Sequence, residues 1–175
     1  MRRHLILVAA FLCCATVAQA AEMPTRKAGQ WELTMQFEGH NLPARSIRQC
    51  IDAATDRLMN SSYGGEGNCS KRDISKVGNT MVVDSVCNYG GATTTSHAVI
   101  TGSFDSAYTV DVTSTRKGGP AIPGMPAGGK SHMKLAAKWL GACPAGEKPG
   151  DMVMGNGMKV NVIEMQKLRG RTPPR

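Results

Sequence analysis

Apolar and polar residues alternate in several short stretches of this chain, a period of two that is typical of strands with one buried face. The clearest stretch is residues 31–38, which opens with Trp31. Residues 97–104, 108–113 and 132–139 follow the same pattern, and they are rich in threonine and valine, which favour sheets. The pattern therefore predicts a chain that consists mainly of strands.

Two more strands are predicted on either side of Gly78. Cys69 and Cys87 are equidistant from this glycine, so a hairpin folded about it places the two cysteines opposite each other. The same register gives two further favourable pairs, Arg72 with Asp84 and Ile74 with Val82. We therefore predict a cross-strand disulfide between Cys69 and Cys87.

The remaining segments predict one helix and two loops. Asp52 can cap a short helix over residues 53–59. Residues 117–130 and 144–157 are rich in glycine and proline and predict loops. Residues 158–168 suit either a strand or a helix.

The six predicted strands follow one another in hairpin order, and the connections within the hairpins are too short for parallel crossovers. The sheet is therefore expected to be antiparallel. Because each strand has one apolar face, the sheet must curl or pack on something to cover it. We predict a mainly β fold, a curved antiparallel meander or partial barrel with one short inserted helix. Whether the sheet closes stays open.

The first twenty residues have the three parts of a secretory signal peptide. Arg2 and Arg3 form a basic start, residues 5–17 are an uncharged apolar run, and Ala18 to Ala20 supply the small-x-small cleavage pattern. The apolar run is too short to span a bilayer, which needs roughly twenty residues, and no other stretch predicts a transmembrane segment.

The signal peptide would direct the protein to the periplasm or outside the cell, where disulfides form, and would be cleaved near Ala20. This cleavage would leave one β-rich domain over residues 21–170, followed by a disordered tail over 171–175. Four cysteines would remain, an even number that predicts two disulfides, and no C-x-x-C pair suggests zinc instead. With Cys69 joined to Cys87, Cys50 and Cys143 pair by elimination.

The chain is basic, with a net charge of +8, of which the leader supplies two positive charges. The other basic residues are scattered, with no run of five and no interleaved aromatic residues. They include Arg26-Lys27, Lys71-Arg72, Arg116-Lys117 and the group Lys167, Arg169 and Arg171. This arrangement favours a well-solvated surface over a nucleic-acid site, so no nucleic-acid partner is predicted. A weak attraction to an anionic envelope surface stays open.

No motif predicts catalysis or a cofactor. The chain has no G-x-S-x-G sequence and no glycine-rich phosphate loop between a strand and a helix. His97 and His132 fall on the polar faces of predicted strands and could line one surface, although two solvated histidines are the simpler interpretation. A hydrolase of unrecognised type would need one of them in a pocket beside an acid.

The methionines suggest one metal hypothesis. Met152, Met154 and Met158 lie close together in the sequence, and thioethers favour Cu(I). His132 could complete such a site only if the fold brings it near. Methionine is also a common filler of protein cores, which is the competing interpretation.

The order of several short motifs resembles a family of secreted proteobacterial proteins, domain of unknown function 3617. The matching segments are Arg26 to Glu32, with Gly29-Gln30-Trp31-Glu32; Arg48-Gln49-Cys50 before the helix; and the cysteine-flanked hairpin with the Thr/Ser/Val meander after it. The resemblance covers nearly the whole chain after the leader and implies an exported protein. It brings no activity, cofactor or catalytic residue. Gly29-Gln30-Trp31 is also similar to the G-x-W of lipocalins, whose tryptophan plugs the closed end of a ligand-binding barrel.

These observations favour a non-catalytic binding protein. Its ligand is expected to be either an apolar or amphipathic small molecule or another protein of the envelope. The expected binding face is concave and apolar and lies around Trp31, Met35 and Trp139. Copper binding and hydrolysis remain the alternatives.

Overall fold

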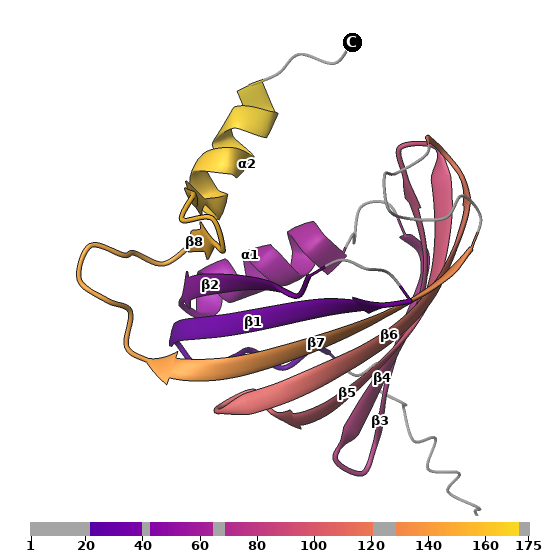
Figure 1. The fold of residues 1–175 in the computed structure, drawn as a ribbon, viewed down its shortest axis with the longest axis horizontal. Coiled ribbons are helices and arrows are strands. Elements are labelled where there is room, and N and C mark those ends of the chain that lie inside the picture. Colours follow the sequence, from indigo (N-terminus) through magenta and orange to yellow (C-terminus); the bar gives the residue numbers. More distant parts are fainter. Residues whose placement is uncertain (1–21, 40–42, 65–68, 121–128, 172–175) are drawn as a thin grey trace, which may run out of the picture.

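The computed structural model describes residues 22–39, 43–64, 69–120 and 129–171. The predicted leader and most of the predicted tail lie outside these ranges. The described residues form one antiparallel sheet of nine strands and two short helices (Figure 1). Neither helix in these ranges is long and apolar enough to cross a membrane.

The strands are β1 (Gly29–Glu38), β2 (Arg45–Ile51), β3 (Cys69–Val77), β4 (Thr80–Tyr89), β5 (Ala92–Ser103), β6 (Ala107–Gly118), β7 (Lys130–Gly141), β8 (Asp151–Met154) and β9 (Lys159–Asn161). The helices are α1 (Ala53–Gly64) and α2 (Val162–Arg171). The order across the sheet is β3-β4-β5-β6-β7-β1-β2-β8-β9. Because β3 and β9 are edges that do not pair with each other, the sheet is open. The predicted curved antiparallel fold is confirmed, without barrel closure.

Several elements differ from the sequence prediction. Nine strands replace the six predicted, because β2 and β8 were not recognised and β9 lies in the segment left open between strand and helix. The predicted loop over 144–157 contains β8, which pairs with β2. The ambiguous segment 158–168 is first a strand and then a helix, since the Asn161 side chain accepts hydrogen bonds from the N–H groups of Ile163 and Glu164 and so caps α2.

The strand β8 is held in place through Asp151, whose side chain is almost fully buried. Burial opposes its ionisation, but hydrogen bonds from Asn161 and the Lys148 N–H, together with Lys159, outweigh it and lower its pKa to about 2. The carboxylate therefore ties the 148–151 turn to β9 and fixes where the C-terminal elements begin.

The β3–β4 hairpin has the predicted disulfide but not the predicted register. Its turn contains two residues, Gly78 and Asn79, so Val77 pairs with Thr80 and the pairs beyond shift by one. The pairs observed are Arg72 with Ser85 and Ile74 with Val83, in place of Asp84 and Val82. An irregularity between Cys69 and Lys71 absorbs one residue and restores the pairing of Cys69 with Cys87, whose Cα atoms are 3.8 Å apart. The second predicted bridge, Cys50–Cys143, is also present.

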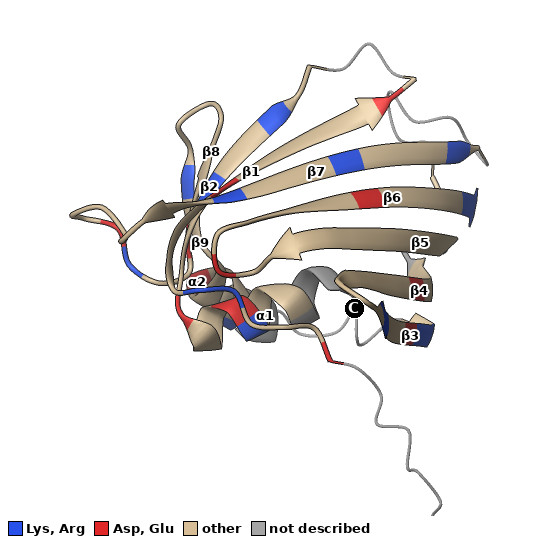
Figure 2. Cartoon of the chain, turned by 90° about the horizontal axis from the view of Figure 1, so that it is seen from below, with Lys and Arg blue, Asp and Glu red and all other residues tan. Residues whose placement is uncertain are grey.

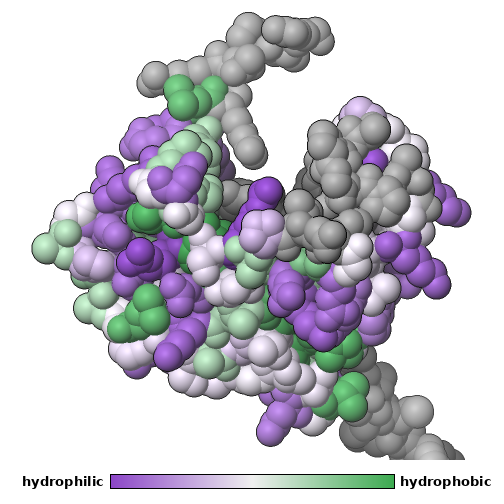
Figure 3. Space-filling model, in the orientation of Figure 1, coloured by the Kyte–Doolittle hydropathy of each residue, from purple (hydrophilic) through white to green (hydrophobic). Residues whose placement is uncertain are grey.

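One face of the sheet, called the inner face here, packs against the helices. The sheet curves around α1, which lies against the strands at one end of that face (Figure 1). The buried core on this face consists of Trp31, Leu33, Ile51, Met59, Ala137, Met152 and Val162. The opposite, outer face carries the polar members of the alternating strands. It appears mostly pale and purple in Figure 3, with apolar side chains in small separate patches.

A buried polar network crosses this core. The guanidinium of Arg26 donates to Asp56 on α1 at 2.7 Å and to the Gln49 side chain on β2 at 2.9 Å. Arg26 is 6 % exposed and Asp56 is fully buried. The Arg26 guanidinium also lies 5.8 Å from the Trp31 ring. The segment before β1 is thereby fixed to α1 and β2 from inside the protein.

Gly29, the first residue of the G-x-W sequence, is required by a close approach between β1 and β7. Its φ is +128°, and a Cβ atom there would lie 2.2 Å from the Gly141 carbonyl oxygen and 2.7 Å from Trp139 Nε1. Both the backbone conformation and the small space available therefore require glycine at this position.

We expect Gly29→Ala to lower the free energy of unfolding by about 2–3 kcal/mol, because it adds a backbone clash to an unfavourable φ. Urea unfolding at neutral pH measures the loss. Gly39→Ala is the matched control: Gly39 also has positive φ, +75°, but nothing lies within 4 Å of its added Cβ. An equal loss in both variants would show that the close approach contributes nothing.

Candidate functional site

Strand pairing aligns the inner-face side chains of six adjacent strands into rows. Two neighbouring rows are apolar, one over five of these strands and the other over all six, and we call them the apolar strip; the shorter row ends at Lys76 on β3. The row nearer the core is Met35, Leu135, Val110, Ile100 and Met81; the next is Phe37, Met133, Val112, Ala98, Val83 and Ile74. The strip crosses six neighbouring strands, in the sheet order β3-β4-β5-β6-β7-β1, and does not reach β2.

Much of the apolar strip is incompletely covered. Only Met81 and Ile100 are buried, and the other nine side chains of the strip are half-buried. The helices pack instead on the adjoining rows, where Trp31, Leu33 and Ala137 form the core. The strip is therefore a continuous apolar surface that the described helices leave partly accessible.

A polar row lies along the far side of the strip, and we call it the polar border. It contains Arg72, Ser85, Ser96, Ser114 and Ser131 from five neighbouring strands. The hydroxyls of Ser114 and Ser131 are hydrogen-bonded at 2.8 Å. Arg116 lies two residues farther along β6 than Ser114, on the same face, opposite Thr94. The inner face thus changes from apolar to polar along the strand direction.

Charge is divided between the two faces. Within β1 to β7, all five acidic residues lie on the outer face: Glu32, Glu38, Asp73, Asp84 and Asp111. The charged residues on the inner face of these strands are all basic: Arg45, Arg72, Lys76 and Arg116. Basic positions also gather at the ends of β3, β6 and β7 beside the polar border (Figure 2). The charged residues on the inner face of these strands are therefore all of one sign.

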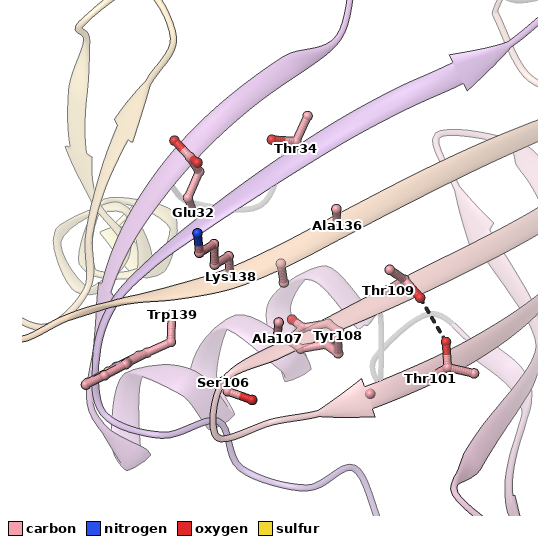
Figure 4. A pocket seen from close by; sticks show the side chains of 12 residues that line it. Glu32, Thr34, Thr101, Ser106, Ala107, Tyr108, Thr109, Ala136, Lys138 and Trp139 are labelled. Atoms are coloured by element: carbon pink, nitrogen blue, oxygen red, sulfur yellow. Dashed lines mark hydrogen bonds between the residues drawn. The ribbon is translucent and has the colours of Figure 1, made fainter.

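Two hollows lie on these faces. One, of about 430 Å³, opens where the strip reaches β3 and β4, and its walls include Lys76, Met81, Ile100 and Phe104. The other, of about 710 Å³, is a shallow hollow on the sheet between β1 and β5. In Figure 4 its Glu32, Thr34 and Lys138 side chains point to one side of the sheet and Trp139 to the other; small side chains, such as Ala136 and Thr109, form its floor.

The predicted ligand-binding residues share the inner face but differ in exposure. Trp31 is fully buried, and its Nε1–H donates to the Lys27 carbonyl. Trp139, which pairs with Trp31, is half-buried, and its Nε1–H donates to the Ala28 carbonyl. The Lys27 ammonium lies 3.7 Å from the centroid of the Trp139 ring. Met35 is part of the apolar strip. The two tryptophans thus form the covered end of the inner face, and Met35 lies on its accessible part.

The predicted copper ligands are not brought together as a set. Met152 is buried in the core, where its sulfur accepts a hydrogen bond from Gln49, whereas Met158 is 53 % exposed. Met154 is half-buried on β8, on the same face as Met152. His132 lies on the outer face of β7, with β1 and β2 between it and β8. Among the described residues, no group of three or more His, Cys, Asp or Glu side chains could hold a metal ion.

His97 and His132 do line one surface, as the alternation predicts. Both lie on the outer face, each paired with Thr113 of β6 between them. His97 contacts Asp84 at 2.7 Å, and His132 lies between Glu38 and Asp111. Each histidine therefore has an acid beside it, but on the exposed outer face, and neither lines the two hollows described above.

We expect His132 to titrate above its ordinary pKa of 6.5. Hydrogen bonds to Asp111 and Glu38 stabilise the imidazolium and raise the pKa. NMR of the imidazole protons against pH should give a midpoint above 6.5, and Asp111→Asn should lower it.

The same pKa shift predicts a pH dependence of stability. Folding favours protonated His132, so its contribution is complete below about pH 6.5 and is lost as the pH rises through the raised value. A midpoint at or below 6.5 in the wild-type protein would contradict the arrangement of His132 between the two acids.

The alternation of β5, β6 and β7 could have indicated most of the apolar strip from the sequence. The polar border could not be found in this way, because Ser96 and Ser114 look unremarkable until pairing places them side by side with Ser85 and Ser131. Nor does the sequence show that Arg72 and Arg116 share a face.

Comparison with models of protein families identifies a family for this chain. The model of a family described as "Protein of unknown function (DUF3617)" matches residues 26–143, from the buried arginine before β1 to the second cysteine of the long disulfide. No curated protein and no solved structure shows significant similarity to the chain.

Proposed function

The chain belongs to the DUF3617 family, whose description assigns no activity, and from its structure we propose that it is an exported, non-catalytic binding protein. Its ligand is an apolar or amphipathic small molecule that lies on the inner face of the curved sheet. Export is supported by the signal-peptide pattern before Ala20 and by two disulfides, which form and persist in oxidising compartments.

One observation carries this proposal: nine side chains of the apolar strip remain half-buried although the sheet already has a core on the same face. Covering a half-buried Val, Leu, Met or Phe is favourable at about 25 cal/mol per Å² of apolar area. The strip therefore offers binding energy that the described helices leave unused. Concave apolar surfaces of this kind are the usual place for small-molecule ligands.

The alternation of strands provides a matched test. Val112 lies in the strip on the inner face, and Thr113 beside it points to the outer face. We expect purified mature protein to bind the uncharged fluorescent probe N-phenyl-1-naphthylamine. We expect Val112→Asn to weaken that binding at least tenfold, whereas Thr113→Asn should leave it unchanged.

Loss of binding counts only if both variants stay folded, which circular dichroism and thiol counting would check. Met133→Asn, from the neighbouring strand of the same row, is a second inner-face variant. If the wild-type protein binds no probe, or if Thr113→Asn weakens binding as much as Val112→Asn, the inner face is not the binding surface. Native mass spectrometry of protein from its own compartment would then show whether a protein partner is retained instead, and its mass would show whether the leader is removed.

A further inference from the structure

We propose that the ligand is a single-chain amphipathic anion of the fatty-acid type, with its alkyl chain on the apolar strip and its carboxylate at the polar border. This proposal rests on the proposed function and adds the chemical class of the ligand and its orientation.

The polarity of the inner face sets the orientation. Two apolar rows are bounded on one side by the closed core around Trp31 and on the other by the polar border. A purely apolar ligand that reached the border would cover its serine hydroxyls with hydrocarbon. An amphipathic ligand with its polar group at the border satisfies both parts of the face, since polar groups are costly to cover without hydrogen bonds.

The charge of the inner face sets the sign of the head group. In β1 to β7, the four charged residues of this face are Arg45, Arg72, Lys76 and Arg116, and the acids of these strands lie on the other side of the sheet. Lys76 and Arg116, and no carboxylate of these strands, therefore face the space that the ligand would occupy. A cationic head group would be repelled there, whereas an anionic one is attracted.

Arg116 and the serines suit a carboxylate in particular. The Arg116 guanidinium donates one hydrogen bond to the Pro120 carbonyl at 2.8 Å. A guanidinium has five N–H donors in a planar fork that matches the two oxygens of a carboxylate. Ser114 lies two positions away on the same face of β6 and is hydrogen-bonded to Ser131, so hydroxyl donors lie beside the arginine.

The width of the apolar strip favours one alkyl chain. The strip is only two rows wide, and rows on one face of a strand are roughly 7 Å apart because each residue rises about 3.3 Å. It nevertheless crosses six strands from β1 to β3. A narrow apolar surface of this kind accommodates one alkyl chain better than the two chains of a phospholipid.

Three matched ligands test this assignment: palmitate, hexadecanol and phosphatidylglycerol vesicles, with displacement of N-phenyl-1-naphthylamine as the readout. Palmitate and hexadecanol are used below the concentrations at which they aggregate. We expect palmitate to displace the probe at least tenfold more effectively than hexadecanol, and the vesicles to displace it least. High salt should weaken palmitate binding and leave hexadecanol binding unchanged.

Arg116→Met and Lys117→Met form the matched pair of variants, because adjacent residues of β6 point to opposite faces. We expect Arg116→Met to weaken palmitate binding about tenfold while hexadecanol binding stays unchanged, which also shows that the variant is folded. Lys117→Met should bind both ligands as the wild-type protein does.

The outcomes separate the two proposals. If palmitate and hexadecanol bind equally, or if Lys117→Met loses as much palmitate affinity as Arg116→Met, the anionic head group is wrong and the proposed function stands. Stronger binding of phosphatidylglycerol would overturn the single-chain assignment. If none of the ligands or the probe binds, the proposed function itself fails. A dimer in solution that Val112→Asn dissociates would show that a second copy covers the strip, and would also overturn the proposal.

Discussion

Removing the Cys50–Cys143 disulfide by a double substitution to alanine is expected to lower the free energy of unfolding by about 4.5 kcal/mol. The reason is the length of chain that the bridge closes, since its cysteines are 93 residues apart. The bridge joins the buried end of β2 to the segment after β7, and so restricts every strand from β3 to β7 in the unfolded chain. Urea unfolding of the oxidised protein at neutral pH measures the change.

The Cys69–Cys87 bridge provides an internal comparison, because its cysteines are only 18 residues apart. The same alanine substitutions there should cost about 3 kcal/mol. The order of the two losses is the critical result. A larger loss at the short bridge would show that loop length does not govern the contribution of these disulfides.

Asp56→Asn is expected to cost about 3–5 kcal/mol, because it leaves the Arg26 guanidinium buried without its counter-ion. The substitution keeps the shape of the side chain, so the loss reports on charge rather than on a cavity. Arg26 also donates to Gln49, and this bond alone does not neutralise it. Denaturant unfolding at neutral pH again gives the measurement.

A double-mutant cycle identifies the ion pair as the cause. Arg26→Met should be as damaging as Asp56→Asn, since it leaves the fully buried carboxylate without its partner. The variant that carries both changes should lose much less than the sum of the two single losses. Additive losses, or a loss below about 1 kcal/mol for Asp56→Asn, would show that water reaches the pair.

Alternation in the sequence predicted the strands whose inner residues are apolar, and it failed where polar residues are buried. In β2, Gln49 occupies an inner position and is satisfied by Arg26 and the Met152 sulfur, so the apolar periodicity is broken there. The strand β8 has only four residues and begins with the buried Asp151. In both cases the stabilising partner is distant in the sequence, and no local pattern can indicate it.

The same limit applies to the charged residues. The sequence suggested that Arg26-Lys27, Lys71-Arg72 and Arg116-Lys117 are solvated pairs. In the structure Arg26 is buried, and on β3 and β6 each pair places one residue on either face of the sheet. Strand alternation predicts that split once the strand is known, but not which member faces inward. Met35 could be assigned to the binding face from its own strand, whereas the polar border required the pairing of five strands.

The division of charge between the faces restricts how proteins of this family can change in length. Inserting or deleting one residue in β6 before Asp111 would move Asp111 to the inner face and Val112 and Arg116 to the outer face, because side chains alternate with a period of two. Such a change would turn the inner-face side chains of the rest of the strand to the outer face, and the outer-face side chains to the inner face. Length differences among functional relatives should therefore fall in the turns, or be absorbed by irregularities such as the one between Cys69 and Lys71.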